Sequence, residues 1–336
     1  MRRTGEQNIS FSWKFLMSII CLVAVFIVAI VVGARDTTIQ DVWSAITSAD
    51  GSQEATIIRE LRLPRETAAV LVGAALGVSG AIMQGLTRNP LADPGLLGLT
   101  AGANAALAVT VAFIPAANYI GIMFACFIGA AIGTLLVVGI GSSKRGGFSP
   151  FRIVLAGAAI TAFLNAIAEG IGITFEISKD VSMWTSGGMI GTTWSQIQII
   201  TPVILIGTFV AILLAKQLTV LSLNEDVAVG LGQNIVVVKL ILFGVIILLA
   251  GAAVSLVGNL AFIGLMIPHI VRGIVGTDYR FVLPMSAVVG SIFMVAADTV
   301  ARTLQAPYET PVVAVVAVVG LPFFLYVVQK GGRAFS

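Results

Sequence analysis

The chain has 336 residues, of which 58% are hydrophobic and only 10% are charged. Soluble domains carry about 25% charged residues, so this composition excludes a water-soluble globular protein and indicates a polytopic membrane protein. The net charge of +3 does not point to nucleic-acid binding, because the basic residues lie in short loops between apolar runs, as membrane orientation requires.

Ten stretches of the sequence approach the length of about 20 apolar residues that a helix needs to cross a bilayer. They lie near 13–33, 66–86, 95–114, 119–141, 151–173, 195–215, 236–257, 260–275, 281–303 and 310–329. The run at 181–191 is too short to cross, so we expect a helix that dips into the membrane or lies on its surface. The span at 260–275 is short and could be broken. We therefore expect an all-α fold with a single transmembrane domain over residues 1–336.

The distribution of basic residues predicts the orientation. An even number of spans places both termini on one side, and with cytoplasmic termini thirteen of the 19 Lys and Arg residues lie inside and six outside. This excess agrees with the positive-inside rule. Three of the outer six, Arg59, Arg62 and Arg65, are clustered before the second span, and this cluster on the disfavoured side requires a functional explanation.

The second span is rich in glycine and leads into a rigid turn. Gly73, Gly77 and Gly80 have the spacing of small residues that allow close helix packing, and packing within the subunit is the expected role. The following segment, 88–95, reads RNPLADPG, and its two prolines predict a non-helical inner loop. This loop is either a cytoplasmic gate or a plain connector.

The span at 151–173 carries small or polar residues on nearly every turn. An ionisable residue inside a membrane span usually faces the interior of the bundle or a water-filled path. The span is therefore expected to line a transport path; alternatively, its glutamate is an interfacial side chain wetted by outside water. The residues concerned are Gly157, Thr161, Asn165, Ala168 and Glu169.

The segment 216–235 is polar but has helical periodicity between two apolar runs. Leu218, Leu221, Val227 and Leu231 could share an apolar side, while residues 224–226 face water. Glycines at 230 and 232 end the helix. We expect a pair of short surface helices that lie against a partner protein.

No catalytic motif is visible in the sequence. There is no phosphate-binding G-x-x-x-x-G-K motif, so any ATP chemistry must come from another chain. The single histidine, His269, has no Cys, Asp or Glu at ligand spacing and makes a poor metal site. Asp298 and Arg302 are four residues apart and are expected to pair within one helix. A transporter, a channel and a membrane scaffold remain as function classes.

Five motifs in fixed order resemble the permease family of bacterial ABC importers for iron-siderophores, haem and cobalamin. They are IRELRLPR (58–65), LVGAALGVSGAIMQGLTRNPLADPGLLG (71–98), LNEDVAVGLG (223–232), GNLAFIGLMIPHIVRGIVG (258–276) and ADTVAR (297–302). The resemblance implies a type II ABC importer permease fold with about ten helices. It also implies three kinds of partner: a second permease subunit, two cytoplasmic ATPases and an outer solute-binding protein.

The resemblance assigns roles to individual residues. Arg62, Arg65 and Arg302 match positions that form salt bridges to glutamates of the binding protein, and Asn89 and Leu91 match the inner gate. The segment 216–235 matches the coupling helices that insert into the ATPases. Its matching positions are Ser222, Leu223, Asn224, Glu225, Asp226, Gly230, Leu231 and Gly232.

The resemblance also implies a location and a cargo. The chain would be a multi-pass protein of the bacterial plasma membrane that binds no cofactor itself, with ATP and Mg²⁺ held by the partner ATPase. The segments 84–89 and 308–311 are more similar to siderophore permeases of Gram-positive bacteria than to the cobalamin permease. A ferric siderophore is therefore the expected cargo; the alternatives are a haem or cobalamin importer permease and a carrier that works without an ATPase.

Overall fold

The computed structural model describes residues 10–33, 38–47, 52–142, 150–186, 188–306 and 308–332. Several basic residues that enter the orientation count lie outside these ranges, namely Arg2, Arg3, Arg35, Lys144, Arg145 and Arg333. The described residues form helices and their connections, with one isolated β-bridge between Gln305 and Tyr308. The predicted all-α fold is confirmed.

Eight helical segments of the described chain are long and apolar enough to cross a membrane. They are α1 (Phe11–Val31), the continuous run of α3 (Gln53–Ile57), η1 (Ile58–Arg62) and α4 (Leu63–Thr87), α6 (Tyr119–Ser142), α7 (Pro150–Thr174), α9 (Trp194–Leu213), α12 (Ile235–Val257), α14 (Tyr279–Thr303) and α15 (Val312–Gly332). The other two predicted spans are shorter helices, α5 (Leu99–Phe113) and α13 (Ile263–Val275). The chain is a multi-pass membrane protein.

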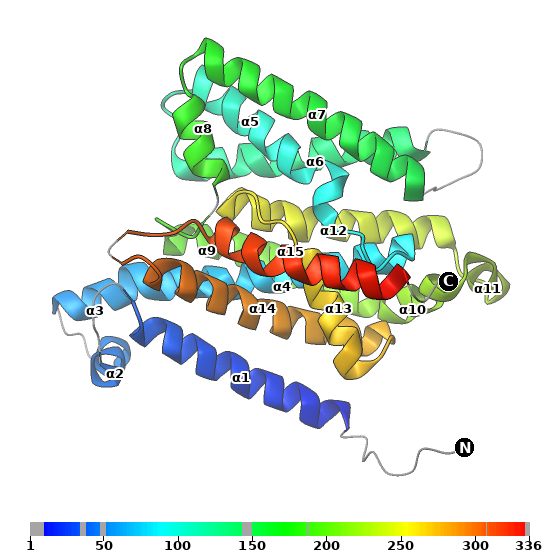
Figure 1. Cartoon of the computed structure of the whole chain (residues 1–336), viewed down its shortest axis with the longest axis horizontal. Coiled ribbons are helices and arrows are strands. Elements are labelled where there is room, and N and C mark those ends of the chain that lie inside the picture. Colours follow the sequence, from blue (N-terminus) through cyan, green and yellow to red (C-terminus); the bar gives the residue numbers. More distant parts are fainter. Residues whose placement is uncertain are drawn as a thin grey trace.

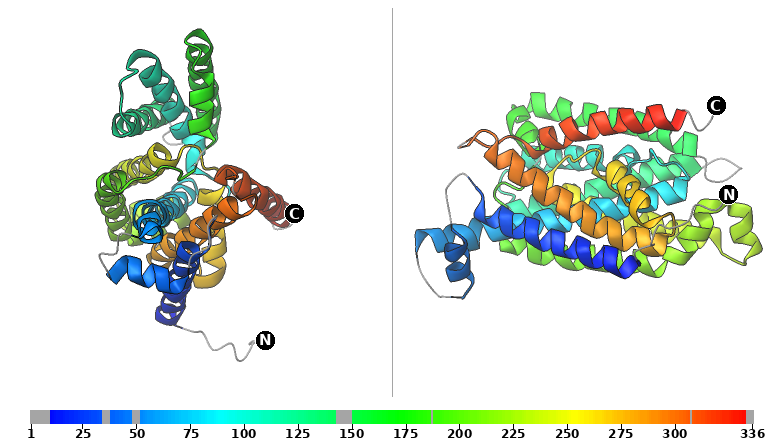
Figure 2. Two further views of the ribbon diagram at one scale, coloured as in Figure 1. Left: turned by 90° about the vertical axis from the view of Figure 1, so that its left-hand side faces the viewer. Right: turned by 60° about the horizontal axis from the view of Figure 1, so that its bottom comes forward.

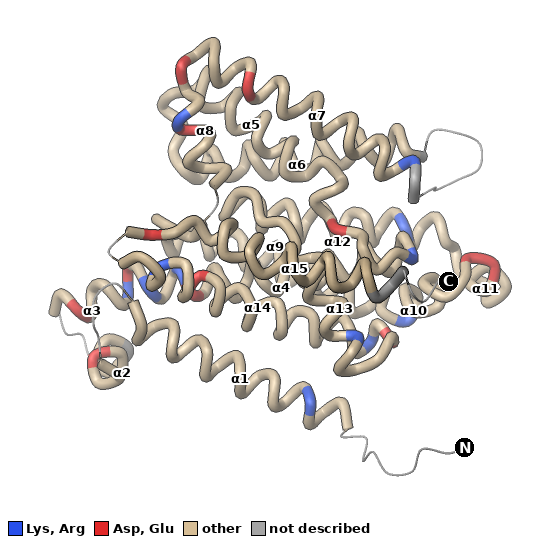
Figure 3. Tube along the Cα trace, in the orientation of Figure 1, with Lys and Arg blue, Asp and Glu red and all other residues tan. Residues whose placement is uncertain are grey.

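Short helices lie at both ends of the bundle. The first end carries α2 (Ile39–Thr47), α3 and α8 (Ser178–Thr185), the last of which was predicted as a short helix near 181–191 (Figure 1). The opposite end carries α10 (Ala215–Leu223) and α11 (Glu225–Gly230). Helix α1 begins and helix α15 ends at the α11 end of the bundle (Figures 1 and 2). Charged residues gather toward these two ends, as a bilayer-spanning slab requires (Figure 3).

Helix α4 is the most buried of the eight spans and lies between α14, α12 and α13. Its glycines explain how the helices approach so closely. A Cβ atom at Gly73 would collide with the carbonyl oxygen of Gly290 on α14, and one at Gly80 with that of Gly264 on α13. The predicted packing role of these glycines within the subunit is therefore confirmed.

The helical structure is interrupted at two places, one after α4 and one before α13. Helix α4 ends at Arg88, which is in the left-handed conformation (φ 51°), and a turn leads into the single 3-10 turn η2 (Pro94–Leu97). The predicted non-helical loop after α4 is thus observed. Helix α13 is preceded by an irregular stretch ending at Phe262 (φ 70°), so the predicted short span begins later than 260.

Candidate functional site

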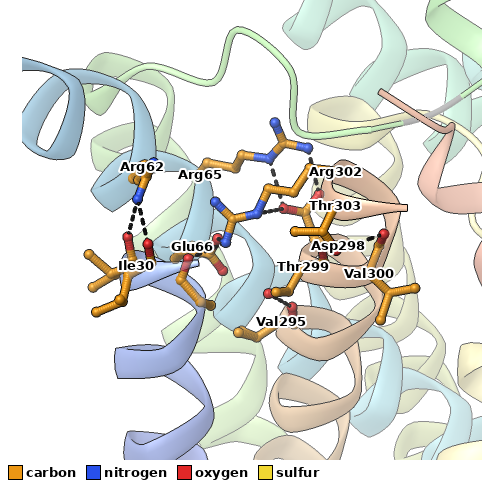
Figure 4. Close-up of polar contacts among 12 residues, drawn as sticks. Ile30, Arg62, Arg65, Glu66, Val295, Asp298, Thr299, Val300, Arg302 and Thr303 are labelled. Atoms are coloured by element: carbon orange, nitrogen blue, oxygen red, sulfur yellow. Dashed lines mark hydrogen bonds and ion pairs between the residues drawn. The ribbon is translucent and has the colours of Figure 1, made fainter. Parts of the chain in front are cut away.

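Five charged residues lie close together at the α2 end of the bundle, where α4 faces α14, namely Arg62, Arg65, Glu66, Asp298 and Arg302 (Figure 4). Glu66 of α4 and Arg302 of α14 are almost completely buried, at 0% and 5% exposure. Arg302 Nη2 lies 2.6 Å from Glu66 Oε1 in an ion pair without hydrogen-bond alignment. The same Nη2 also donates to the carbonyl of Ala29 on α1. This pair therefore ties three helices together in a medium where an uncompensated charge is costly.

Arg65 forms the second part of this cluster. Its Nε and Nη2 donate to the two carboxylate oxygens of Asp298, at 2.7 and 3.0 Å, which is the bidentate geometry that suits a guanidinium group. Its Nη1 donates to both oxygens of Glu309, at 2.8 and 3.0 Å. The predicted pairing of Asp298 with Arg302 is present but longer, at 3.9 Å. Arg65 thus binds α4 to α14 and to the segment before α15.

Arg62 is also directed inward. It is 6% exposed, and its Nη1 donates to the carbonyls of Ile30 and Val31 at the end of α1, at 2.6 and 3.0 Å (Figure 4). The structure therefore brings Arg62, Arg65 and Arg302 together, as expected for one docking site. It also directs their guanidinium groups to partners within the chain, which the sequence does not reveal.

Two cavities follow the face of α7 from this end toward the opposite one. The outer cavity, of about 610 Å³, lies between α5, α7 and α8. The deeper one, of about 480 Å³, reaches the turn after α4 and includes Leu91 in its lining. Asn104 of α5, Asn165 of α7 and Asn259 before α13 line both cavities. The three amides therefore mark where the two cavities meet.

The lining tests the residues predicted from α7. Thr161, Asn165, Ala168 and Glu169 line one or both cavities. Gly157 lines neither cavity: a Cβ atom there would collide with the carbonyl oxygen of Leu96, so this glycine packs against the turn η2. At this position the side of α7 that carries small residues packs on η2.

The turn after α4 is fixed by hydrogen bonds at both of its ends. Asn89 N–H donates to the Gln84 carbonyl at 3.2 Å, and Asn89 Oδ1 accepts from the N–H of Leu91 at 2.9 Å. Gln84 Nε2 in turn donates to the carbonyl of Leu265, at 3.0 Å, and Gln84 Oε1 accepts from Arg272. The predicted gate residues thus stand on a turn whose base is anchored to α13.

The polar segment at the α11 end forms two helices, as predicted, but its apolar side is different. Leu218 and Leu221 of α10 are buried, whereas Val227 and Leu231 are 48% and 70% exposed, so the four residues do not share one face. The reason is that Asn224 interrupts the helix: its Oδ1 accepts from the N–H of Asp226 and caps a new helix. α10 packs on the bundle, and α11 leaves apolar side chains exposed.

The remaining positions predicted for coupling lie at the end of α10, in α11 and just after α11. Ser222 donates to the Thr219 carbonyl at 2.7 Å, and Leu223 is 72% exposed. Gly232 has φ 78°, whereas Gly230 ends α11 without a positive φ. Glu225 lies 3.1 Å from Arg88 and 2.9 Å from Lys239. Asp278 caps α14, and hydrogen bonds from the Arg280 side chain lower its pKa below the usual carboxyl range.

Comparison with known proteins identifies this arrangement. A family model described as the FecCD transport family matches residues 21–330. The chain belongs to the FecCD transport family. It is 42% identical over 339 residues to the iron(3+)-hydroxamate import system permease protein FhuB of Bacillus subtilis (strain 168), covering 98% of this chain and 88% of that protein. It is 41% identical to the Fe(3+)-citrate import system permease protein YfmD of the same organism, covering 95% and 96%.

A solved structure agrees with this FecCD assignment. An inward-facing metal-chelate type ABC transporter superposes with a TM-score of 0.82 at 26% identity, covering 95% of this chain and 99% of that one. The type II importer permease fold expected from the resemblance is therefore confirmed. This FecCD chain is the membrane permease of an ABC importer.

Sequence reasoning missed two of the three amides in the FecCD permease cavity. Asn104 lies in the apolar run LTAGANAALAVTVAF, and its Oδ1 is buried without a hydrogen-bond partner among the described residues. A lone asparagine in such a run is itself a signal, because polar groups in spans usually face a cavity or a partner helix. Asn259 falls between the spans predicted at 236–257 and 260–275, and it lines the cavity from the irregular stretch before α13.

Proposed function

We propose that this chain is the permease subunit of an ABC importer that moves a ferric siderophore into the cytoplasm by alternating access. The observation that carries the proposal is the pair of cavities that meet at the amides of Asn104, Asn165 and Asn259 and extend to the turn bearing Leu91. Amide groups can hydrogen-bond the oxygen-rich surface of an iron chelate. The names of the relatives above, which refer to iron(3+)-hydroxamate and Fe(3+)-citrate import, support the same cargo class.

The partners follow from the exposed surfaces. Helix α7 exposes large apolar side chains beside the cavities, including Leu155, Phe163 and Ile173 at 62%, 60% and 74% exposure. We infer that a second permease subunit completes the path there, either a copy or a sister chain. The exposed segment around α11, with Leu223 before it and Leu231 after it, fits the segment expected to couple the permease to two cytoplasmic ATPases. These ATPases, and not this chain, would bind ATP and Mg²⁺.

The orientation and the outer partner complete the proposal. The α11 end, where α1 begins and α15 ends, would face the cytoplasm of a bacterial cell, with the chain in the plasma membrane (Figure 1). The α2 end would then receive the solute-binding protein, and the cluster of Arg62, Arg65 and Arg302 would lie at that docking face. The turn bearing Asn89 and Leu91 would close the path from the cytoplasmic side.

The test is uptake by the complete transporter in proteoliposomes with its ATPase and binding protein. We expect ATP-dependent uptake of an iron-55 siderophore chelate, and much less uptake of haem or cobalamin. Uptake without ATP would favour a carrier that needs no ATPase. Preferred uptake of haem or cobalamin would overturn the cargo assignment while leaving the importer assignment intact.

A second test addresses the gate. Single cysteines at Asn89 or Leu91, in a background without Cys21 and Cys126, should crosslink across the permease dimer when the path is closed to the cytoplasm. The crosslink should decrease when the nucleotide state opens that side. A crosslink yield of zero in every state would contradict the gate assignment.

A further inference from the structure

One carboxylate joins three elements at the α11 end. The same oxygen of Glu225, Oε1, lies 3.1 Å from Nη2 of Arg88 and 2.9 Å from Nζ of Lys239. Glu225 is the first residue of α11, Arg88 caps the end of α4, and Lys239 lies in the second turn of α12. The carboxylate therefore lies between the coupling segment, the gate turn and a transmembrane helix.

The three side chains differ in how firmly they are held. The Lys239 side chain is 8% exposed, so α12 provides a nearly fixed cation. Glu225 and Arg88 are 33% and 40% exposed. The direction of the Glu225 carboxylate depends on α11, because Asn224 caps that helix one residue earlier. A movement of α11 would therefore displace the carboxylate relative to Lys239 and carry the guanidinium group of Arg88 with it.

Arg88 is well placed to pass such a movement to the gate. It immediately precedes Asn89, and its left-handed backbone conformation sets the direction in which the chain leaves α4. A non-glycine residue in this conformation is held there by its surroundings. The preceding turn is anchored, since Gln84 bonds to α13. The turn that begins at Arg88 and includes Asn89 and Leu91 thus follows directly on this anchored base.

We propose that Glu225 is a positioning residue that links the coupling helix to the cytoplasmic gate through Arg88. The proposal rests on the proposed function, because it assumes that an ATPase moves α11. When the ATPases move α11, the Glu225 to Arg88 ion pair shifts the turn at 88–91 and changes the width of the path at Leu91. Lys239 keeps the carboxylate in register when α11 returns.

The chain offers a matched control outside the coupling segment. Arg280 forms an ion pair at the same end of the bundle, at 2.5 Å to Asp278, without touching the gate turn. Arg280→Gln therefore removes a charge and an ion pair without removing the proposed link.

The experiment measures uptake of an iron-55 trihydroxamate chelate and ATP hydrolysis by the complete transporter in proteoliposomes. Glu225→Gln and Arg88→Gln should each lower the chelate transported per ATP hydrolysed at least threefold, while Arg280→Gln stays near the wild-type ratio. Arg88→Gln leaves the Glu225 to Lys239 pair intact, so it preserves the fold even if Glu225→Gln weakens assembly. The double variant should be no worse than either single one, because both changes break one link.

Each possible result either supports or overturns the proposed link between Glu225 and the gate. A wild-type ratio in Arg88→Gln, or losses that multiply in the double variant, would overturn the link and leave the proposed function standing. Equal losses in Arg280→Gln would attribute the effect to the loss of any charge at this end of the bundle and also overturn it. A wild-type transporter without ATP-dependent uptake would instead overturn the proposed function, and with it this inference.

Discussion

The two ends of α4 hold their charges in opposite ways. At the α2 end, Glu66, Asp298 and Arg302 are buried and packed into a closed set of ion pairs. At the α11 end, Arg88 and Glu225 are more than 30% exposed and only Lys239 is buried. A buried pair holds helices rigidly because losing one partner is costly, whereas an exposed pair contributes little and can be rearranged. The comparison indicates that one end of α4 is a fixed anchor and the other is an adjustable contact.

The largest expected effect comes from opening the buried cluster. Glu66→Ala should leave Arg302 without its closest carboxylate and destabilise the protein by about 3–5 kcal/mol. Thermal unfolding of the detergent-purified permease measures this loss. The matched change at the other end, Arg280→Gln, removes an exposed pair and should cost far less. Similar losses in both variants would remove the distinction between the two ends.

The next effect concerns the backbone at Gly230 and Gly232, in the segment proposed for coupling. Gly232 has φ 78°, which valine adopts only at a cost of about 1–3 kcal/mol, so Gly232→Val should uncouple ATP hydrolysis from uptake while membrane insertion survives. Gly230 is not at a positive φ and its surroundings are open, so Gly230→Val should have the smaller effect. Uptake per ATP in proteoliposomes compares the two. Full uptake by both variants would reduce this segment to a linker.

A smaller effect is expected at the docking face. Because Arg65 already binds Glu309, the carboxylates of a binding protein would have to compete for it. Glu309→Gln should therefore tighten binding-protein docking by up to about fivefold, corresponding to the 0–1 kcal/mol of an exposed pair, and less at high salt. Titration of the reconstituted transporter with binding protein measures this affinity. Glu176→Gln removes a charge from the same end and serves as the control; an equal gain there would attribute the effect to net charge.

Charge reversal at the arginines proposed for docking needs an additional control, because Arg62 and Arg302 are buried in the structure. Reversing Arg62 and Arg302 to glutamate together would break contacts to Ala29, Ile30 and Glu66 inside the chain. Loss of docking in that variant would be accompanied by loss of stability. Restoration by glutamate-to-arginine changes on the binding protein would separate the two, because it repairs docking alone.

The smallest effect is a pH dependence at the α11 end. The pKa of Asp278 is lowered in the folded protein, first by the hydrogen bond from Arg280, so its contribution is present above the ordinary carboxyl pKa and is lost as the pH falls through the lowered value. Asp278→Asn keeps the helix cap but removes the charge, and should lower the stability at pH 7 by less than about 1 kcal/mol. Unfolding midpoints of both proteins should converge in acid. A constant difference from pH 7 to acid would contradict this.

Several features were predictable because they depend on local chemistry. Apolar length marked ten spans, eight of which are long apolar helices in the described chain, and glycine spacing at Gly73, Gly77 and Gly80 marked the packing face of α4. Helix periodicity with capping residues indicated α11, although the break at Asn224 moved Val227 and Leu231 to an exposed face. The packing of Gly157 on η2 was not predictable for a related reason, since small residues on a helix suit both a cavity and a close backbone contact.

The sequence by itself determined that the chain is an all-α membrane permease, because hydrophobic length, glycine spacing and ordered motifs are properties of contiguous residues. Only the tertiary structure decided which charges meet: Arg65 pairs with Asp298 and Glu309 more than 230 positions away, and Glu225 reaches back to Arg88 across 137 positions. An ion pair depends on distances of a few ångströms between side chains, and these distances are fixed by helix packing. The sequence alone therefore identifies the charged residues but not the distant residues with which they form ion pairs.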